Sequence, residues 1–255
     1  MFSSKSIAFV LCIACGGLAA GMSLAEQASL DLRHFFRFDT DQPGKGPAGF
    51  TAFTVGEGPA GAWIVEADPQ APTSPNRLSQ STACPTTAVQ ERPGCLQLLL
   101  LDGLTYEYPD LTVRLRAASK NPQGGETGQS GPTQAGLVFG ATKDARTFYA
   151  AIVDLTTGML DVVRVTDGKI MSIGHETVKR KPVPWHTLRL QHNTILSKDF
   201  LEISFDGNIV FTHSDKKLGT GQIGLMTRGE APVWFDNFDA VQLFSQRLLS
   251  PPAAY

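Results

Sequence analysis

This sequence has no excess of basic residues, and it has no long apolar run beyond its first 25 residues. Its 22 lysines and arginines are balanced by 24 acidic residues, which leaves a formal net charge of -2. This balance lacks the electrostatic signature of a nucleic-acid-binding protein. No later stretch is long and apolar enough to span a bilayer. Amphipathic periodicity over three helical turns is missing as well, which argues against a helical bundle.

The first 25 residues have the features of a secretory signal peptide. Lys5 gives a basic start, residues 7–14 are apolar, and residues 23–25 (SLA) form a small-x-small cleavage site. We therefore predict cleavage after Ala25 and a periplasmic or secreted protein. Lipidation at Cys15 is the alternative, because the residues before it resemble a lipoprotein signal.

Cysteine is scarce, and only Cys84 and Cys95 lie beyond the predicted signal peptide. In an exported protein, two cysteines so close in the sequence are expected to form a disulfide. Such a bond closes a short loop and stabilises the fold by about 3 kcal/mol at most. The alternative is a pair of buried free thiols.

Residues 56–61 (GEGPAG) have the Gly-x-Gly-x-x-Gly spacing of a dinucleotide-binding turn. That turn functions only where a strand leads into a helix, whose N-terminus then binds the pyrophosphate. Here Pro59 interrupts the turn, and the residues that follow, AWIVEADP, are typical of a strand carrying Trp63. We therefore interpret the segment as a loop leading into a strand and expect no nucleotide ligand.

Strand patterns dominate the rest of the chain. Residues 111–117, 185–192 and 200–205 alternate apolar and polar side chains, as in strands with one face in the core and one in solvent. Residues 148–153 and 160–165 are apolar on both faces, which is typical of central strands.

Turn chemistry separates these strands. Asp-Gly pairs stand at 167–168 and 206–207 between apolar runs, which predicts hairpin turns. Residues 119–134 are polar and rich in glycine, so we expect a flexible loop there. Residues 247–255 are expected to form a disordered tail. One β-sandwich domain is therefore predicted over 26–246.

The order of motifs in the chain resembles the concanavalin A-like lectin/glucanase superfamily. The motifs are AGLVFGATKDARTFYAAIV, LDVVRVTDGK, PWHTLRLQ, LEISFDGNIVF and GTGQIGLMTRGEAPVWFDNFDAVQL. The chain is most similar to the bacterial exported family of 3-keto-disaccharide hydrolases and family 16-type glycosidases, and its FRFD, PAGF and NRLSQ segments also fit. The resemblance implies an all-β fold, an antiparallel two-sheet jelly-roll sandwich, and activity on or binding to sugars.

The paired carboxylates of a glycoside hydrolase are not evident in the sequence. Glucanases of this fold carry them on one strand, as Glu-x-Asp-x-x-Glu or Glu-x-Asp-x-Glu. The Glu-x-Asp at Glu66 and Asp68 lacks the second glutamate, and Pro69 follows it. We interpret both residues as solvated strand-end groups and assign no catalytic residue. A hydrolytic pair would have to come from two different strands.

Four residues are candidates to line a sugar-binding groove: Tyr149, Arg164, Arg228 and Trp234. An aromatic ring offers a sugar a large contact area at low entropic cost, and Trp234 is the best candidate for such a platform. At each of the four positions, a structural role is the alternative. Relatives carry an arginine shortly after the aromatic pair at 148–149, where this chain has alanines and an isoleucine.

Four aspartates near the chain ends are candidate ligands for a structural calcium ion: Asp39, Asp41, Asp236 and Asp239. Terminal strands of such sandwiches usually pair, which would bring these hard oxygen ligands together. The alternative is structural, with Asp236 and Asn237 forming a bulge and binding backbone groups. The 5 histidines show no zinc-type spacing.

Taken together, these patterns favour an exported, non-catalytic module that binds a carbohydrate or another extracellular polymer. The first alternative is a glycoside hydrolase acting on a di- or polysaccharide. The second is a structural or protein-binding domain of the cell envelope. No Gly-x-Ser-x-Gly segment supports a serine hydrolase.

Overall fold

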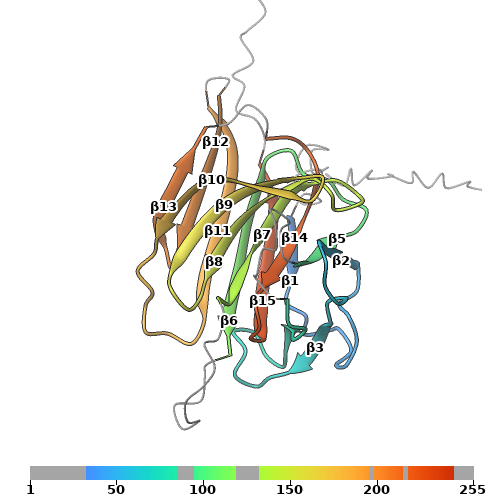
Figure 1. Cartoon of the computed structure of the whole chain (residues 1–255). Helices are drawn as coiled ribbons and strands as arrows, with labels where there is room; N and C mark the ends of the chain where they lie inside the picture. The colour runs from blue at the N-terminus through green and yellow to red at the C-terminus, as the bar shows by residue number, and fades with distance from the viewer. Residues whose placement is uncertain (1–32, 85–94, 119–131, 196–197, 215–217, 244–255) are drawn as a thin grey trace, which may run out of the picture. The chain divides into compact units, whose positions relative to one another are not determined.

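The alternating segments form two antiparallel sheets that pack face to face (Figure 1). The computed structural model describes residues 33–84, 95–118, 132–195, 198–214 and 218–243. The predicted signal peptide, the tail at 247–255 and most of the loop at 119–134 lie outside these residues. The regular secondary structure within them is all strand, which confirms the all-β prediction.

The first sheet has eight strands. Their bounds are β1 Arg33–Phe36, β3 Trp63–Ala67, β4 Asn76–Gln80, β6 Pro109–Ala117, β11 His186–Ile195, β12 Lys198–Phe205, β13 Asn208–His213 and β15 Val233–Gln242. Seven of them run across the sheet in the order β13, β12, β11, β6, β15, β4, β3. The remaining strand, β1, pairs with the C-terminal part of β15, as expected for terminal strands.

The second sheet has seven strands. Their bounds are β2 Phe50–Val55, β5 Leu96–Leu101, β7 Gln134–Ala141, β8 Phe148–Asp154, β9 Met159–Thr166, β10 Lys169–Thr177 and β14 Gln222–Arg228. They lie in the order β10, β9, β8, β7, β14, β5, β2. Neither β8 nor β9 is an edge strand, as their two apolar faces predict. The prediction of a loop over 119–134 extends one residue too far, because Gln134 is the first residue of β7.

The main core lies between the two sheets. On β6, Leu111, Val113 and Leu115 point inward and alternate with polar residues that face away from the core. They meet apolar side chains of the second sheet, including Leu137 and Leu225, and all five are fully buried. Burying one such side chain stabilises the fold by about 1.5–3 kcal/mol. This burial selects the strand register, since a shift by one residue would turn the polar set inward.

The second sheet is apolar on its outer face as well. A second cluster of buried side chains there includes Leu98 and Leu100 of β5, Val138 of β7, and Phe148 and Ala150 of β8. The outer face of the first sheet is instead polar, with Arg114 and Arg116 projecting from β6. The two outer faces therefore differ in chemistry, and the one on the second sheet lacks the polar lining of a sugar site over this area.

Both predicted Asp-Gly turns are confirmed. Asp206 and Gly207 have φ of 50° and 84°, and Asp167 and Gly168 have φ of 50° and 77°. Positive φ at both central residues is the geometry of a two-residue hairpin that matches the strand twist. The turns join β12 to β13 and β9 to β10.

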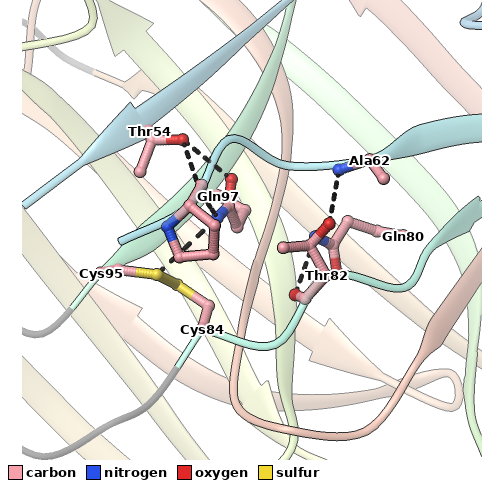
Figure 2. The surroundings of a disulfide bond; sticks show 8 residues. Thr54, Ala62, Gln80, Thr82, Cys84, Cys95 and Gln97 are labelled. Atoms are coloured by element: carbon pink, nitrogen blue, oxygen red, sulfur yellow. Dashed lines mark hydrogen bonds between the residues drawn. A yellow bond between two sulfur atoms is a disulfide. The ribbon is translucent and has the colours of Figure 1, made fainter. Parts of the chain in front are cut away.

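The predicted disulfide between Cys84 and Cys95 is present, with a Cα–Cα distance of 5.4 Å (Figure 2). It closes beside Gln97, whose side-chain nitrogen donates to the Pro59 carbonyl at 2.6 Å and whose side-chain oxygen accepts from Thr54 Oγ1 at 3.1 Å. These bonds attach the 56–61 segment to β5.

Two glycines of the GEGPAG segment are required by packing. A Cβ on Gly58 would overlap Cys95, and one on Gly61 would overlap the Gln97 side chain. The segment then leads into β3, the strand that carries the buried Trp63. The glycine spacing therefore serves close packing beside the disulfide, as expected for a loop that enters a strand.

His192 is a titratable side chain inside the main core. It lies on β11 and is 1% exposed, with its ring centroid 5.0 Å from that of Tyr108 and 6.1 Å from that of Phe139. Neither ring nitrogen has a partner of hydrogen-bonding geometry among the described residues, although the Glu107 backbone lies near. Burial lowers the pKa of His192 below its usual 6.5.

We expect acid to destabilise the protein through His192. Below pH 6.5, His192 binds a proton more readily in the unfolded chain than in the folded chain, where its pKa is lower. The stability that comes from keeping His192 neutral is therefore complete above pH 6.5 and is lost as the pH falls below it. The free energy of unfolding should fall by up to about 1.4 kcal/mol per pH unit in this range. Urea unfolding measured at neutral pH and at about pH 5 checks this.

The matched variants are His192→Leu and His175→Leu, because His175 is an exposed histidine on β10. His192→Leu should flatten the pH dependence, whereas His175→Leu should leave it unchanged. Equal pH dependence in both variants would contradict the role assigned to His192.

Candidate functional site

A pocket of about 600 Å³ lies where one end of the main core meets solvent. Its lining comes from residues 116–118 at the end of β6, from Leu155 and Thr156 after β8, and from the segment that leads into β11. That segment contributes Arg180, Val183, Pro184 and His186, the first residue of β11. Leu155 also belongs to the main core, so the pocket floor is apolar. A second hollow of about 550 Å³ adjoins it and shares Arg180, Val183 and His186. We call the two together the end pocket.

Basic side chains gather at the end pocket. Arg180 donates a hydrogen bond to the Leu155 carbonyl, which holds its guanidinium at the pocket. Lys181 lines the adjoining hollow, and its Nζ donates to the backbone carbonyl of Asp206 at 2.7 Å. Neither cation has a carboxylate partner among the described residues. Within the described residues, neither cation is therefore balanced by an ion pair at the pocket.

Arg116 lines the end pocket and also contacts Trp234 on the outer face of the first sheet. Trp234 of β15 is the register partner of Arg116, whose guanidinium lies 5.1 Å from the centre of the indole ring. Arg77 of β4 lies on the same ring at 4.1 Å. The tryptophan is thus stacked with two arginines from the strands on either side of it. A sugar could stack on this ring only by displacing an arginine.

Asp68 is not the solvated strand-end residue that the sequence predicts. It is buried, and its Oδ2 accepts from Arg77 at 2.6 Å, while Glu66 Oε2 lies 3.3 Å from the same guanidinium. The reason is the β3–β4 register, which places Glu66 opposite Arg77. The two carboxylates neutralise this arginine, and neither faces a second free carboxylate.

Asp206 lies beside the pocket, and its carboxylate oxygens bind residues 181–187. It accepts hydrogen bonds from the Thr187 N–H at 3.0 Å and from the Lys181 N–H at 3.4 Å, and His186 Nδ1 lies 2.8 Å from its Oδ2. Burial raises the pKa of Asp206, but these hydrogen bonds outweigh burial and hold the pKa below its usual range. Asp206 is thus an ionised anchor for residues 181–187.

The four predicted ligand-binding residues do not converge on one groove. Tyr149 is 4% exposed and packs on Phe139 in the main core, with ring centroids 5.2 Å apart. Arg164 is its register partner on β9, so these two lie side by side on the inner face. Arg228 lies at the end of β14 with the parity of the outer cluster, and Trp234 lies on the other sheet. Of the four, Trp234 alone lies beside the end pocket.

The outer face of the second sheet carries a polar group at one end. Asp161 of β9 is the register partner of Ile152 on β8, and Asp154 follows two residues later on the same face. Burial raises the pKa of Asp161, although His175 and Arg228 favour its ionised form. Burial also lowers the pKa of Arg228, and Asp161 opposes that shift. Two carboxylates from neighbouring strands therefore lie close together here.

The predicted bulge at Asp236 is confirmed, because the β15–β6 register shifts between Asp236 and Asp239 and Asn237 has φ of 49°. Asp236 is 0% exposed and accepts from the Thr73 N–H at 2.7 Å and from Thr73 Oγ1 at 2.9 Å. The bulge falls where the partner of β15 changes from β4 to β1. Thr73 therefore satisfies the buried carboxylate of Asp236 at the bulge.

The other predicted calcium ligands also have protein partners. Asp239 forms an ion pair with Arg37, Asp39 accepts from the Asn76 N–H at 3.3 Å, and Asp41 accepts from the Ala48 N–H at 3.1 Å. The structure shows no group of three or more acidic, histidine or cysteine ligands within the part of the chain it describes. Asp39 and Asp236 are close enough for Asp39 to raise the pKa of Asp236, after the larger effect of burial.

The residues that line the end pocket were not singled out by the sequence patterns. A signal was present, since Lys179, Arg180 and Lys181 are consecutive basic residues directly before Pro182. No sequence signal connects them with Arg116, which reaches the same pocket from β6. That juxtaposition depends on the pairing of β6 with β11.

Comparisons with known proteins place the fold among lectin-type sandwiches. No family model and no curated protein sequence matches the chain. A carbohydrate-binding module, CBM66 from Bacillus subtilis, is 16% identical with a TM-score of 0.53, and the match covers 75% of this chain and 94% of the module. The Ca2+/Man-bound form of the VIP36 exoplasmic/lumenal domain is 10% identical with a TM-score of 0.54, covering 86% and 93%.

The carbohydrate recognition domain of Emp47p is a third similar structure, at 11% identity and a TM-score of 0.52, covering 84% of this chain and 96% of that domain. At these identities the similarity shows the fold. The chain therefore has the two-sheet sandwich of concanavalin A-like lectins and carbohydrate-binding modules.

We expect Thr73→Val to destabilise the protein. The substitution removes the hydroxyl that bonds to the buried Asp236 carboxylate, and loss of one partner of a buried group costs about 1–3 kcal/mol. The loss should be the same in calcium and in EDTA, because Thr73 and Asn237 donate to the carboxylate. Urea unfolding measures it, with the exposed Thr177→Val as control. A loss that appears only in calcium would point to a metal at Asp236.

Proposed function

We propose that this chain is an exported, non-catalytic module that binds a glycan or another extracellular polymer. The observation that carries the proposal is the end pocket, which has a volume in the usual range for ligand sites. It combines an apolar floor at Leu155 with hydrogen-bond donors on Arg116 and Arg180. Carbohydrate-binding modules and lectins with the same fold support the choice of ligand class.

The pocket has the parts that recognition of a sugar requires. A pyranose ring presents apolar C–H faces and hydroxyl edges, which suit an apolar floor with fixed donors at the rim. Trp234 lies next to Arg116 and extends this surface onto the first sheet. We assign Trp234, Arg116 and Arg180 to ligand contact, and we give Tyr149 a structural role because it is buried in the main core.

Export is part of the proposal. The Cys84–Cys95 disulfide is of the kind that persists outside the cytoplasm. The structure contains no helix, within the residues it describes, that is long and apolar enough to cross a membrane. We propose removal of the predicted signal peptide after Ala25 and a periplasmic or secreted location.

The first test is a glycan array probed with the purified protein, with and without calcium. We expect binding to a defined set of glycans, and we expect Trp234→Ala to weaken it up to about tenfold, because the indole ring holds Arg116 at the pocket by a cation–π contact of about 0.5–2 kcal/mol. Phe35→Ala is the matched control, since Phe35 is an exposed aromatic on β1 that contributes nothing to the pocket lining.

The array tests both the predicted calcium site and the proposed function. Binding that requires calcium, and that Asp41→Asn abolishes, would support the predicted structural calcium. Failure to bind any glycan in either condition would contradict the proposed function and favour the structural or protein-binding alternative. That alternative already has one feature in its favour, the buried apolar outer face of the second sheet.

Hydrolysis of a sugar is the second candidate function, and the carboxylates Asp154 and Asp161 favour it. They come from different strands and are diagonal neighbours on one face, a spacing of about 7–8 Å between backbones. Burial raises the pKa of Asp161, as a general acid requires, while Asp154 accepts N–H bonds from Thr156 and Thr157. The resemblance to 3-keto-disaccharide hydrolases agrees with this reading.

A hydrolase would be recognised by reducing-sugar release from the glycans bound on the array. If the candidate pair is catalytic, Asp161→Asn should lower the rate at least a hundredfold, since general acid catalysis contributes about 10²–10⁴-fold. Asp167→Asn, an exposed turn aspartate, is the control. Release that survives Asp161→Asn unchanged would remove this pair from consideration.

A further inference from the structure

We infer that the end pocket takes an acidic glycan, an oligosaccharide bearing carboxylate groups, and that Arg116 and Arg180 bind the carboxylates. This inference rests on the proposed function and specifies the substrate class of the same site. It starts from a difference among the arginines of the first sheet and its adjoining segments.

Two arginines on the outer face of the first sheet form ion pairs with carboxylates. Arg77 is paired with Asp68 at 2.6 Å, and Arg189 is paired with Asp110, also at 2.6 Å. At the end pocket the arrangement changes. Arg116 and Arg180 have no carboxylate partner among the described residues, although both line the same pocket.

The positive charge at the pocket is not a consequence of overall composition. The whole chain carries a formal net charge of -2, so its basic residues are slightly outnumbered. Lys181 adds a third cation in the adjoining hollow, and the nearby carboxylate of Asp206 accepts from His186 and from backbone N–H groups. Unneutralised cations grouped in a concave site raise the local concentration of anions.

Both arginines are held in place by neutral contacts. Arg180 donates to the Leu155 carbonyl and retains further N–H donors. Arg116 lies over the Trp234 ring, a contact that leaves its N–H edge free to bind. A planar guanidinium matches a carboxylate with two parallel hydrogen bonds. Because the two side chains are already restrained, less entropy is lost when the ligand binds.

The rest of the lining suits a sugar better than an inorganic anion. Leu155, Ala117 and Val183 provide apolar surface in the same pocket as the two arginines, and Val183 is 41% exposed. A uronate residue has both a carboxylate and apolar ring C–H groups. It can therefore satisfy the cations and cover the apolar floor at the same time, which a free phosphate ion cannot do.

The test is isothermal titration calorimetry on the purified protein with oligogalacturonate, oligoalginate and their methyl-esterified forms. Esterification removes the charge and keeps the sugar skeleton. We expect the acidic forms to bind at least tenfold more tightly than the esters, with the difference shrinking at high salt. Arg116→Gln and Arg180→Gln should each weaken binding of the acidic form about tenfold or more.

Arg146→Gln is the control, because Arg146 is an exposed arginine on the turn before β8 and is absent from the pocket lining. It removes the same charge and should leave affinity unchanged. Circular dichroism confirms that each variant is folded.

The outcomes separate the two proposals. Equal affinity for acidic and esterified forms, or binding of neutral array glycans alone, would overturn the acidic-ligand inference and leave the proposed function in place. Failure to bind any glycan would overturn both. Tighter binding to anionic lipid vesicles or to a DNA oligonucleotide than to any acidic glycan would also overturn the inference, since it would identify a different class of anionic partner.

Discussion

The structure depends on one constraint, the burial of two apolar sheet faces against each other. Strands such as β6 and β11 contribute alternate residues to this core and turn the others outward. Once the inner faces are paired, side chains at the ends of the strands are left where the sheets stop covering one another. The end pocket lies at such a place, with the core residue Leu155 as its floor and the end of β6 as one wall. The candidate site is thus a consequence of how the core ends.

Local features around the core agree with it. The Asp-Gly hairpins have the backbone geometry that twisted strands require. The disulfide, Gln97 and the close-packed glycines hold the 56–61 segment against β5 (Figure 2). At the Asp236 bulge, where β15 changes partner, Thr73 donates hydrogen bonds to the buried Asp236 carboxylate. Each of these features satisfies a hydrogen-bonding or steric requirement that the two packed sheets create. A sequence that folds reliably is expected to have local conformational preferences that agree with its overall fold.

The two sheets differ in what their outer faces offer to a ligand. The second sheet is apolar and buried over much of its outer face, with the Asp154 and Asp161 carboxylates at one end. The first sheet presents arginines, most clearly in the stack of Arg77 and Arg116 on Trp234. Exposed basic side chains therefore concentrate on the first sheet and at the end pocket, where Arg116 and Arg180 lie next to apolar surface. The buried Tyr149 and the outward-facing Trp234 lie on different sheets.

The sequence patterns predicted the all-β class, the main strands and both Asp-Gly turns, and they favoured a disulfide over free thiols. They offered the Asp236 bulge as the alternative to a calcium site. These follow from periodicity, turn propensity and short-range chemistry, all of which act over a few neighbouring residues. Three other features emerge from the three-dimensional structure: Asp68 is paired with Arg77, Tyr149 and Trp234 lie on different sheets, and Arg116 meets Arg180 at one pocket. Those outcomes depend on strand order and register, since residues far apart in the chain become neighbours only through β-sheet pairing. No local signal carries that information, because it arises from the packing of the whole core.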